Sequence, residues 1–304
     1  MCCLLFLLTA FQVLPLTNSS SWLSPCFQVG GAPSSLSYGP GQGGSLQVSA
    51  TYRLAPWGLS RRSADAIKVR IIHNVFLDKV VVTVSAIASK KLPPLPRVGV
   101  RMRCAGVFDT VEWFGRGPHE CYPDRKSSAR FGRYISSVHD MHIPYIVPSE
   151  NGGRADVSWA VLSHREADVI SMKCCQEGHL QFNKGVLRPQ VRNHTAISKV
   201  PGLIISIPHN SNAQVSVQKH ALESLEQASH THELEELTDG GDGSLHLHVD
   251  HLHMGLGGDD SWTPSVHPNF IILPGSEWSW SLTLAPIQSD YDANALHNKL
   301  QEIE

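Results

Sequence analysis

The sequence predicts an all-β protein built from two layers of antiparallel strands. Three observations support this fold class: apolar and polar residues alternate over many short stretches, Gly and Pro interrupt the connections, and helical periodicity is rare. In Leu46–Leu54 every second residue is apolar, and the residues between are Gln47, Ser49, Thr51 and Arg53. Successive side chains of a strand point to opposite faces, so this alternation is typical of a strand with one buried face.

The same alternation predicts strands further along the chain. These stretches are residues 67–71, 80–84, 98–104, 157–162, 203–207, 245–252 and 278–284. Apolar residues recur at helical spacing only around residues 220–229 and over 291–303, which predicts one or two short peripheral helices. Many short strands with so few helices pack most simply as two facing sheets, and they leave no room for alternating strand and helix units.

The two ends of the chain differ in composition from its middle. Residues 3–16 form an apolar run, followed by small polar residues, that is shorter than the roughly 20 residues needed to span a bilayer. No Lys or Arg precedes this run, so a secretory signal and a chance apolar start both stay open. Residues 26–44 are rich in Gly, Pro and Ser. We therefore expect a signal-like or disordered lead-in over 1–44, a β-sandwich domain over 45–288 and a helical tail over 289–304.

Charge and cysteine content exclude several classes of protein. The formal net charge is -2, and no basic stripe interleaved with aromatic residues is present, which argues against a nucleic-acid partner. No apolar stretch is long enough for a membrane helix, so no membrane partner is expected. The seven cysteines are odd in number, and adjacent Cys174 and Cys175 would point apart on a strand, which disfavours a disulfide framework.

The densest group of unusual residues is the stretch 113–125, which we interpret as a loop. Its glycines and prolines favour tight turns, and its charged residues are spaced so that guanidinium and carboxylate groups can brace the loop. The structural candidates are Trp113, Arg116, Glu120, Tyr122, Asp124 and Arg125. A bracing network is favoured over direct ligand contact, because paired charges near turns are usually structural. Cys121 follows His119 and Glu120 directly, an arrangement that seldom places a base against a nucleophile, so no catalytic residue is assigned.

Two further stretches are rich in glycine. In residues 148–154 a proline and a glycine pair predict a turn between strands, and Glu150, Asn151 and Arg154 belong to the same structural group. In residues 254–262 the glycines favour a protruding loop that carries Trp262. There an indole can cover the apolar face of a sugar ring while Asp259 and Asp260 accept hydrogen bonds from its hydroxyl groups. The alternative is a core tryptophan.

A run of histidines suggests a zinc site, but its spacing argues against one. On a regular strand His246 and His248 share a face with Asp250, whereas His251 and His253 lie on the other face. At most two histidines then point together, and a structural zinc ion needs four convergent ligands. We therefore expect no metal site here.

Read in order, these motifs resemble one family: the small chain, or C-terminal fifth domain, of the bacterial-type β-galactosidases (lactases) of glycoside hydrolase family 2. The stretches that carry the resemblance are residues 96–99, 113–125, 145–154, 228–232 and 253–268, and together they cover about 45–286. One such motif alone would be weak, but an ordered series of them is specific.

The resemblance implies a supersandwich of the galactose-mutarotase-like type, packed in the whole enzyme beside a catalytic barrel. Retaining glycosidases use two carboxyl groups about 5 to 5.5 Å apart, and in the family both belong to the barrel. It therefore implies that this chain is inactive alone and that its partners are a catalytic chain or domain and a galactoside such as lactose. By position Trp262, with Asp259 and Asp260, matches the motif that reaches the sugar. No cofactor is expected in this chain; the resemblance allows magnesium and sodium in the whole enzyme and slightly favours the cytoplasm.

The sequence departs from the family pattern in two places. Cys121 stands where the family has Asn, and the stretch that opens the family's domain is not found, so its first strands are expected to be missing and an edge to be exposed. Two other functions stay open: a freestanding carbohydrate-binding module, and an aldose epimerase-like protein with the same fold. An epimerase needs a His acid and a carboxylate base in one cleft, which the sequence does not pair.

Overall fold

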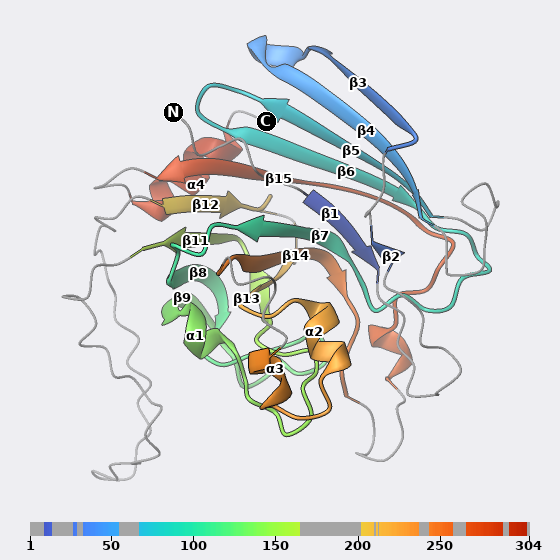
Figure 1. Ribbon diagram of the computed structural model, residues 1–304. Coiled ribbons are helices and arrows are strands. Elements are labelled where there is room, and N and C mark those ends of the chain that lie inside the picture. The colour runs from blue at the N-terminus through green and yellow to red at the C-terminus, as the bar shows by residue number, and fades with distance from the viewer. Residues whose placement is uncertain are drawn as a thin grey trace.

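The strands of the computed structural model form two facing sheets. It describes residues 9–13, 27–28, 33–54, 67–164, 202–209, 211, 213–236, 243–257, 266–287 and 292–302. In this part of the chain one sheet has nine strands and the other six, and the main hydrophobic core lies between them (Figure 1). All neighbouring strands are antiparallel. The predicted all-β, antiparallel sandwich is confirmed.

The strand order places residues distant in the sequence side by side. The nine-stranded sheet runs β3 (Ser35–Pro40), β4 (Leu46–Leu54), β5 (Ile67–Val75), β6 (Val80–Ile87), β15 (Glu277–Ile287), β12 (Gly202–Ser206), β11 (Trp159–Ser163), β8 (Thr110–Gly117) and β9 (Arg130–Ser137). The six-stranded sheet runs β10 (Arg154–Val157), β13 (Ala213–Gln218), β14 (Leu245–His253), β7 (Arg97–Cys104), β1 (Thr9–Val13) and β2 (Phe27–Gln28).

Every stretch predicted from alternation contains strand, but one prediction joined two strands. Residues 157–162 divide at Ser158, because β10 ends at Val157 in the six-stranded sheet and β11 begins at Trp159 in the other. The chain therefore passes from one sheet to the other at this point, which the polarity pattern of the sequence did not indicate.

Several strands were not predicted, among them β8 and β13. All six residues of β13 are buried, and β8 is buried or half-buried along its whole length. The residues of β13 do alternate between apolar and polar, so this strand gave a signal that was missed, whereas in β8 adjacent aromatic residues and two glycines interrupt the alternation. The interpretation of 113–125 as loop throughout is wrong for its first part, since Trp113 and Arg116 lie on β8.

The expected lead-in also contains paired backbone. β1 pairs with β7, and β3 pairs with β4 over six residue pairs. β3 gave a weak signal because its side chains are mostly exposed. Regular structure therefore begins before residue 45.

The main core is formed by the inner faces of both sheets. From β5 and β6 it takes Ile67, Val69, Ile71, Val82 and Val84, and from β7 and β14 it takes Val98, Val100, Met102, Leu245, Leu247 and Val249. Burial of each such side chain contributes about 1.5–3 kcal/mol relative to exposure. This core fixes β7 and β14 side by side, and the loops described below leave from their ends.

The C-terminal helix α4 (Ala293–Gln301) covers part of the opposite face of the nine-stranded sheet. Leu296 and Leu300 pack with Trp159, Val161 and Ile204 in a second hydrophobic cluster. Asp292 caps the helix by accepting a hydrogen bond from the Asn294 backbone N–H at 2.9 Å. The helix predicted over residues 291–303 is confirmed for its described part.

A buried polar contact also holds α4. His297 Nδ1 and Ser206 Oγ lie 2.7 Å apart, and Gln301 Nε2 donates to the same Ser206 oxygen at 2.9 Å. Burial, with a smaller contribution from His209, lowers the pKa of His297 to about 4. His297 is therefore neutral at pH 7.

We expect acid to weaken this contact. The His297 pKa is lower in the folded chain than the ordinary 6.5, so its contribution is complete above about pH 6.5 and is lost as the pH falls towards 4. Urea unfolding at pH 7 and pH 4.5 should show a loss for the wild type that exceeds that of His297→Gln by about 1–3 kcal/mol. Equal losses in the two proteins would contradict this role, because the other histidines are common to both.

The remaining helices are short. They are α1 (Val138–Met141), α2 (Leu222–Gln227) and α3 (Glu233–Glu236). Leu222, Leu225 and Leu234 form a small separate cluster that joins α2 to α3. The helix predicted around residues 220–229 is thus present, and none of the described helices has the length and hydropathy needed to cross a membrane.

Candidate functional site

Three loops that the sequence singled out meet where β8, β14 and β10 begin or end. One loop follows β8, the second precedes β10 at Arg154, and the third follows β14 at His253. Glu120, Tyr122 and Asp124 of the first loop each bond to one of the other two. The first loop is therefore the centre of the cluster.

Glu120 joins the first loop to the second. Its Oε1 accepts hydrogen bonds from Arg125 Nη2 at 2.5 Å and from the Tyr145 hydroxyl, and its Oε2 accepts from the Gly152 backbone N–H at 2.8 Å. Gly152 has a φ of +72°, and a Cβ there would lie 2.4 Å from the Met141 carbonyl oxygen. The second loop therefore needs glycine at this position.

A buried ion network lies beneath these loops. Arg97, at the start of β7, donates from Nη2 to Asp250 Oδ2 at 2.6 Å and from Nη1 to Glu150 Oε2 at 3.0 Å. The Tyr122 hydroxyl donates to Glu150 Oε1 at 3.2 Å. The side chains of Arg97 and Asp250 are only 2% and 3% exposed, so their charges are almost completely removed from water.

The electrostatics of this network keep its arginine charged and its tyrosine protonated. Burial opposes the charge of Arg97, but the carboxylates of Asp250 and Glu150 outweigh burial and raise its pKa. Burial and the nearby Glu150 raise the pKa of Tyr122 well above 10, so its hydroxyl remains a donor. Sequence reasoning missed Arg97 and Asp250 as site residues, although a charged residue at the start of an apolar strand was a signal for the arginine.

The second loop is held by amide and guanidinium groups. Asn151 Oδ1 accepts from the Ile143 backbone N–H at 3.1 Å, and Gln218 Nε2 donates to the Asn151 carbonyl oxygen at 2.9 Å. Arg154 donates to the Gly152 carbonyl oxygen at 3.0 Å, and its guanidinium lies 5.0 Å from the centre of the Trp113 ring. Burial lowers the pKa of Arg154 to about 10, so it is still charged at pH 7.

Arg116 braces the far side of the first loop. Its Nε lies 2.5 Å from Asp156 Oδ2, its Nη1 donates to the Ala129 carbonyl oxygen at 2.9 Å, and Lys126 Nζ lies 2.9 Å from Asp156 Oδ1. Asp156 has a φ of +53° at an irregularity in β10. Asp156 was also missed, because only the tertiary structure brings it to Arg116.

Asp124 connects the first loop to the third. Its Oδ2 accepts a hydrogen bond from the Gly257 backbone N–H at 2.6 Å. A Cβ on Gly255 would lie 2.7 Å from the same oxygen and 2.9 Å from Phe270 Cβ. Asp259, Asp260 and Trp262 fall outside the described residues, so the structure places the approach to this stretch and not the predicted sugar contacts themselves.

We expect Gly255→Ala to destabilise the protein by about 1–3 kcal/mol, because the added methyl group overpacks the contact with Asp124 and Phe270. Thermal or urea unfolding would measure the loss. Gly39→Ala is the matched control, since a Cβ there has nothing within 4 Å. Equal stability of Gly255→Ala and Gly39→Ala would contradict the close contact.

The histidine run differs from the sequence prediction at its end. A register shift in β14 between Asp250 and Leu252 interrupts the alternation, so His253 lies with Asp250 and not opposite it. Its Nε2 lies 3.9 Å from Glu150 Oε1, and burial lowers its pKa. Among the described residues no group of three or more His, Cys, Asp or Glu side chains is arranged to hold a metal ion.

Cys121 has the features of a structural thiol. It is fully buried, and its Sγ accepts a hydrogen bond from the Ala155 backbone N–H at 3.2 Å. Burial raises the pKa of this thiol, which disfavours the thiolate that a nucleophile requires.

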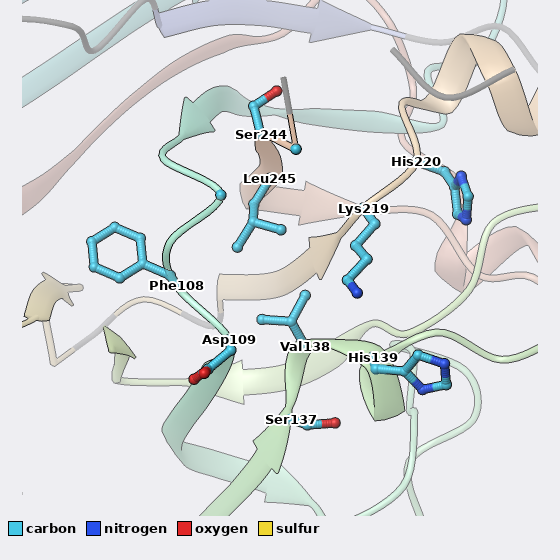
Figure 2. Close-up of a pocket in the computed structure, with 11 residues that line it drawn as sticks. Phe108, Asp109, Ser137, Val138, His139, Lys219, His220, Ser244 and Leu245 are labelled. Atoms are coloured by element: carbon cyan, nitrogen blue, oxygen red, sulfur yellow. The ribbon is translucent and has the colours of Figure 1, made fainter. Parts of the chain in front are cut away.

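A separate pocket lies at the opposite end of β14, around Leu245. It has a volume of about 440 Å³ and an apolar floor that includes Val138 and Leu245. Figure 2 shows the side chains of Leu245 and Val138 pointing toward each other, with the Lys219 ammonium reaching toward Val138. No sequence motif pointed to this pocket, because its residues come from four separate segments of the chain.

Comparison with known proteins identifies the family. Residues 33–284 match the model of the beta galactosidase small chain. The chain belongs to this family. The small chain is 35% identical over 224 residues to a beta-galactosidase of Vibrio cholerae, covering 73% of this chain and 17% of the relative. It is 34% identical over 194 residues to a beta-galactosidase of Pseudoalteromonas haloplanktis, covering 64% of this chain and 14% of the relative.

The chain thus spans less than a fifth of the length of these curated relatives. Solved structures similar to the small chain include a galactose mutarotase-like protein from Lactobacillus casei, with a TM-score of 0.40 and 8% identity over 83% of this chain and 73% of that one. Another is a putative aldose 1-epimerase from Escherichia coli, with a TM-score of 0.40 and 10% identity over 92% of this chain and 84% of that one. The family named from the motifs is confirmed by the family match over residues 33–284.

Proposed function

We propose that this small chain completes the galactose-binding site of a β-galactosidase whose catalytic barrel lies on another chain or outside this sequence. The observation that carries the proposal is the family match over residues 33–284. Its substrates would be terminal β-galactosides such as lactose.

In this proposal Trp262 covers the apolar face of the galactose ring, and Asp259 and Asp260 accept hydrogen bonds from its hydroxyl groups. The position of the preceding residues supports it, since Asp124 holds the Gly257 backbone N–H beside the buried network. A rigid base of this kind favours binding because less conformational entropy is lost when the sugar binds.

Three carboxylates of the loop cluster support a division of labour between binding and chemistry. Glu150 and Asp250 both bond to Arg97, and Glu120 bonds to Arg125 and to the Gly152 N–H. A retaining glycosidase needs one carboxylate free to attack the sugar and one carboxyl group free to donate a proton. We therefore place both groups on the catalytic barrel, and we place any magnesium or sodium ion of the whole enzyme there too.

The test combines two purified proteins. One is this small chain, and the other is the Vibrio cholerae relative shortened by the segment that the small chain matches, called the large chain below. Neither should hydrolyse a chromogenic galactoside alone, and their mixture should. Turnover by the small chain alone, or a mixture no more active than its parts, would refute the proposal.

The two other functions make different demands on the molecule. A freestanding module would bind galactose without the large chain, with millimolar affinity lost in Trp262→Ala, which titration would detect. An epimerase would need a His and a carboxylate open to the sugar. His253 lies near Glu150, but its side chain is only 4% exposed and Glu150 is already bonded to Arg97 and Tyr122, so this pair belongs to the buried network.

A further inference from the structure

The core-side face of the nine-stranded sheet continues to β3, the edge strand of this sheet among the described residues. Residues directly opposite each other in antiparallel strands point to the same face. Three cross-strand rows therefore run from β3 through β4 and β5 to β6. They are Leu36–Ala50–Ile71–Val84, Tyr38–Val48–His73–Val82 and Pro40–Leu46–Val75–Val80. The β6 end of each row lies in the main core.

Burial decreases steadily along these rows. Val82 and Val84 are 1% and 0% exposed, whereas Leu36 is 62% and Tyr38 82% exposed. Leu46 and Val75, at the ends of their strands, are 50% and 38% exposed. In the part of the chain that the structure describes, no strand of the six-stranded sheet covers this face at this corner, which lies at the outer edge of the molecule (Figure 1).

The other face of β3 and β4 is polar. It carries Ser35, Ser37, Ser49 and Thr51, which alternate with the apolar residues. An edge strand that presents serine to one side and leucine and tyrosine to the other has the pattern of a strand with one buried face. Contiguous exposed apolar surface of this kind marks an interaction site.

We propose that this corner, defined by Leu36, Tyr38, Leu46 and Val75, is the surface through which the small chain docks on the large remainder of a β-galactosidase. The inference rests on the proposed function. We name this partner because the matched segment is only 17% of the Vibrio cholerae relative. Most of the chain that accompanies this domain in that relative therefore lies outside the structure. A stable interface buries about 800 Å² of surface on each partner and has an apolar centre. The exposed apolar side chains at this corner would form that centre.

The variant Leu36→Ser/Tyr38→Ser tests this surface. Both side chains are mostly exposed, so the fold should be retained and the unfolding temperature should change little. The Kd for the large chain, measured by titration, should rise at least about tenfold, because removal of central apolar contacts has effects of this size. The kcat of the complex at saturating large chain should not change. Tyr38→Glu, at the more exposed of the two positions, is a second variant if the double variant does not fold.

The matched control is Val107→Ser/Leu273→Ser. It also removes two exposed apolar side chains, which are 57% and 66% exposed and lie outside the three rows. Its Kd should remain within about twofold of the wild type.

The outcomes separate the two proposals. If the wild-type small chain does not bind the large chain, the proposed function fails and this inference fails with it. If the wild type binds and Leu36→Ser/Tyr38→Ser binds equally well, only this surface is wrong. If the small chain alone dimerises in sedimentation and the same variant is monomeric, the occupant is a second copy and the commitment to the large chain is overturned.

Discussion

Replacement of Arg97 by methionine should destabilise the small chain by about 3–5 kcal/mol. Arg97 is the cation between Asp250 and Glu150, and its loss leaves the nearly inaccessible Asp250 carboxylate without a positive partner. Removal of one member of a buried ion pair is more costly than removal of both, since an uncompensated charge stays out of water. Urea unfolding at pH 7 would measure the effect.

Two further variants make this result specific. Arg97→Met combined with Asp250→Asn should recover part of the loss, because the isolated charge is gone. Arg101→Met is the matched control on the same strand. Arg101 pairs with Glu223 at 2.7 Å, but these side chains are 14% and 29% exposed, so the loss should stay within about 1 kcal/mol. Equal losses in Arg97→Met and Arg101→Met would show that the network has no special role.

The second large effect concerns activity. In the mixture with the large chain, Trp262→Ala should lower kcat/KM by about ten- to hundredfold, the range for losing a well-packed apolar contact with the substrate. Trp262→Phe keeps an aromatic face and should lose less. The assay needs saturating amounts of each variant small chain, so that weaker docking is not mistaken for weaker sugar binding.

Two observations would contradict this prediction. Unchanged kcat/KM in Trp262→Ala would show that the indole does not contact the sugar. A loss of stability in Trp262→Ala equal to that expected for a buried core tryptophan, about 3–5 kcal/mol, would favour the alternative reading of the sequence. Unfolding measurements on the small chain alone distinguish these cases.

Much of the fold was predictable because strand formation with one buried face leaves a local signature. Leu46–Leu54 was predicted with the boundaries that β4 has, since its polar and apolar residues alternate without interruption. β13 carries the same alternation and was missed, and the sequence did not indicate that Gln214, Ser216 and Gln218 are buried together with its apolar residues. Polar residues in a buried strand are stabilised by partners elsewhere, as when Gln218 donates to the Asn151 carbonyl oxygen.

The site was predictable as a set of motifs but not as an arrangement. The sequence indicated that Glu120, Arg125 and Asp124 belong to a braced loop, and the structure pairs Glu120 with Arg125 five residues away. It did not indicate that Asp124 contacts Gly257, 133 residues away, or that a register shift turns His253 towards Asp250.

By itself, then, the sequence determined the class of fold and the family, since both depend on residues close together in the chain: strand periodicity, turn-forming glycines and ordered motifs. Only the tertiary structure decided that Arg97 pairs with Asp250, 153 residues away, and that the apolar side chains of Leu36 and Tyr38 are exposed. The physical reason is that ion pairing and burial depend on which strands become neighbours and how far one sheet extends over the other. Packing of the whole chain sets both of these, and no local pattern records them.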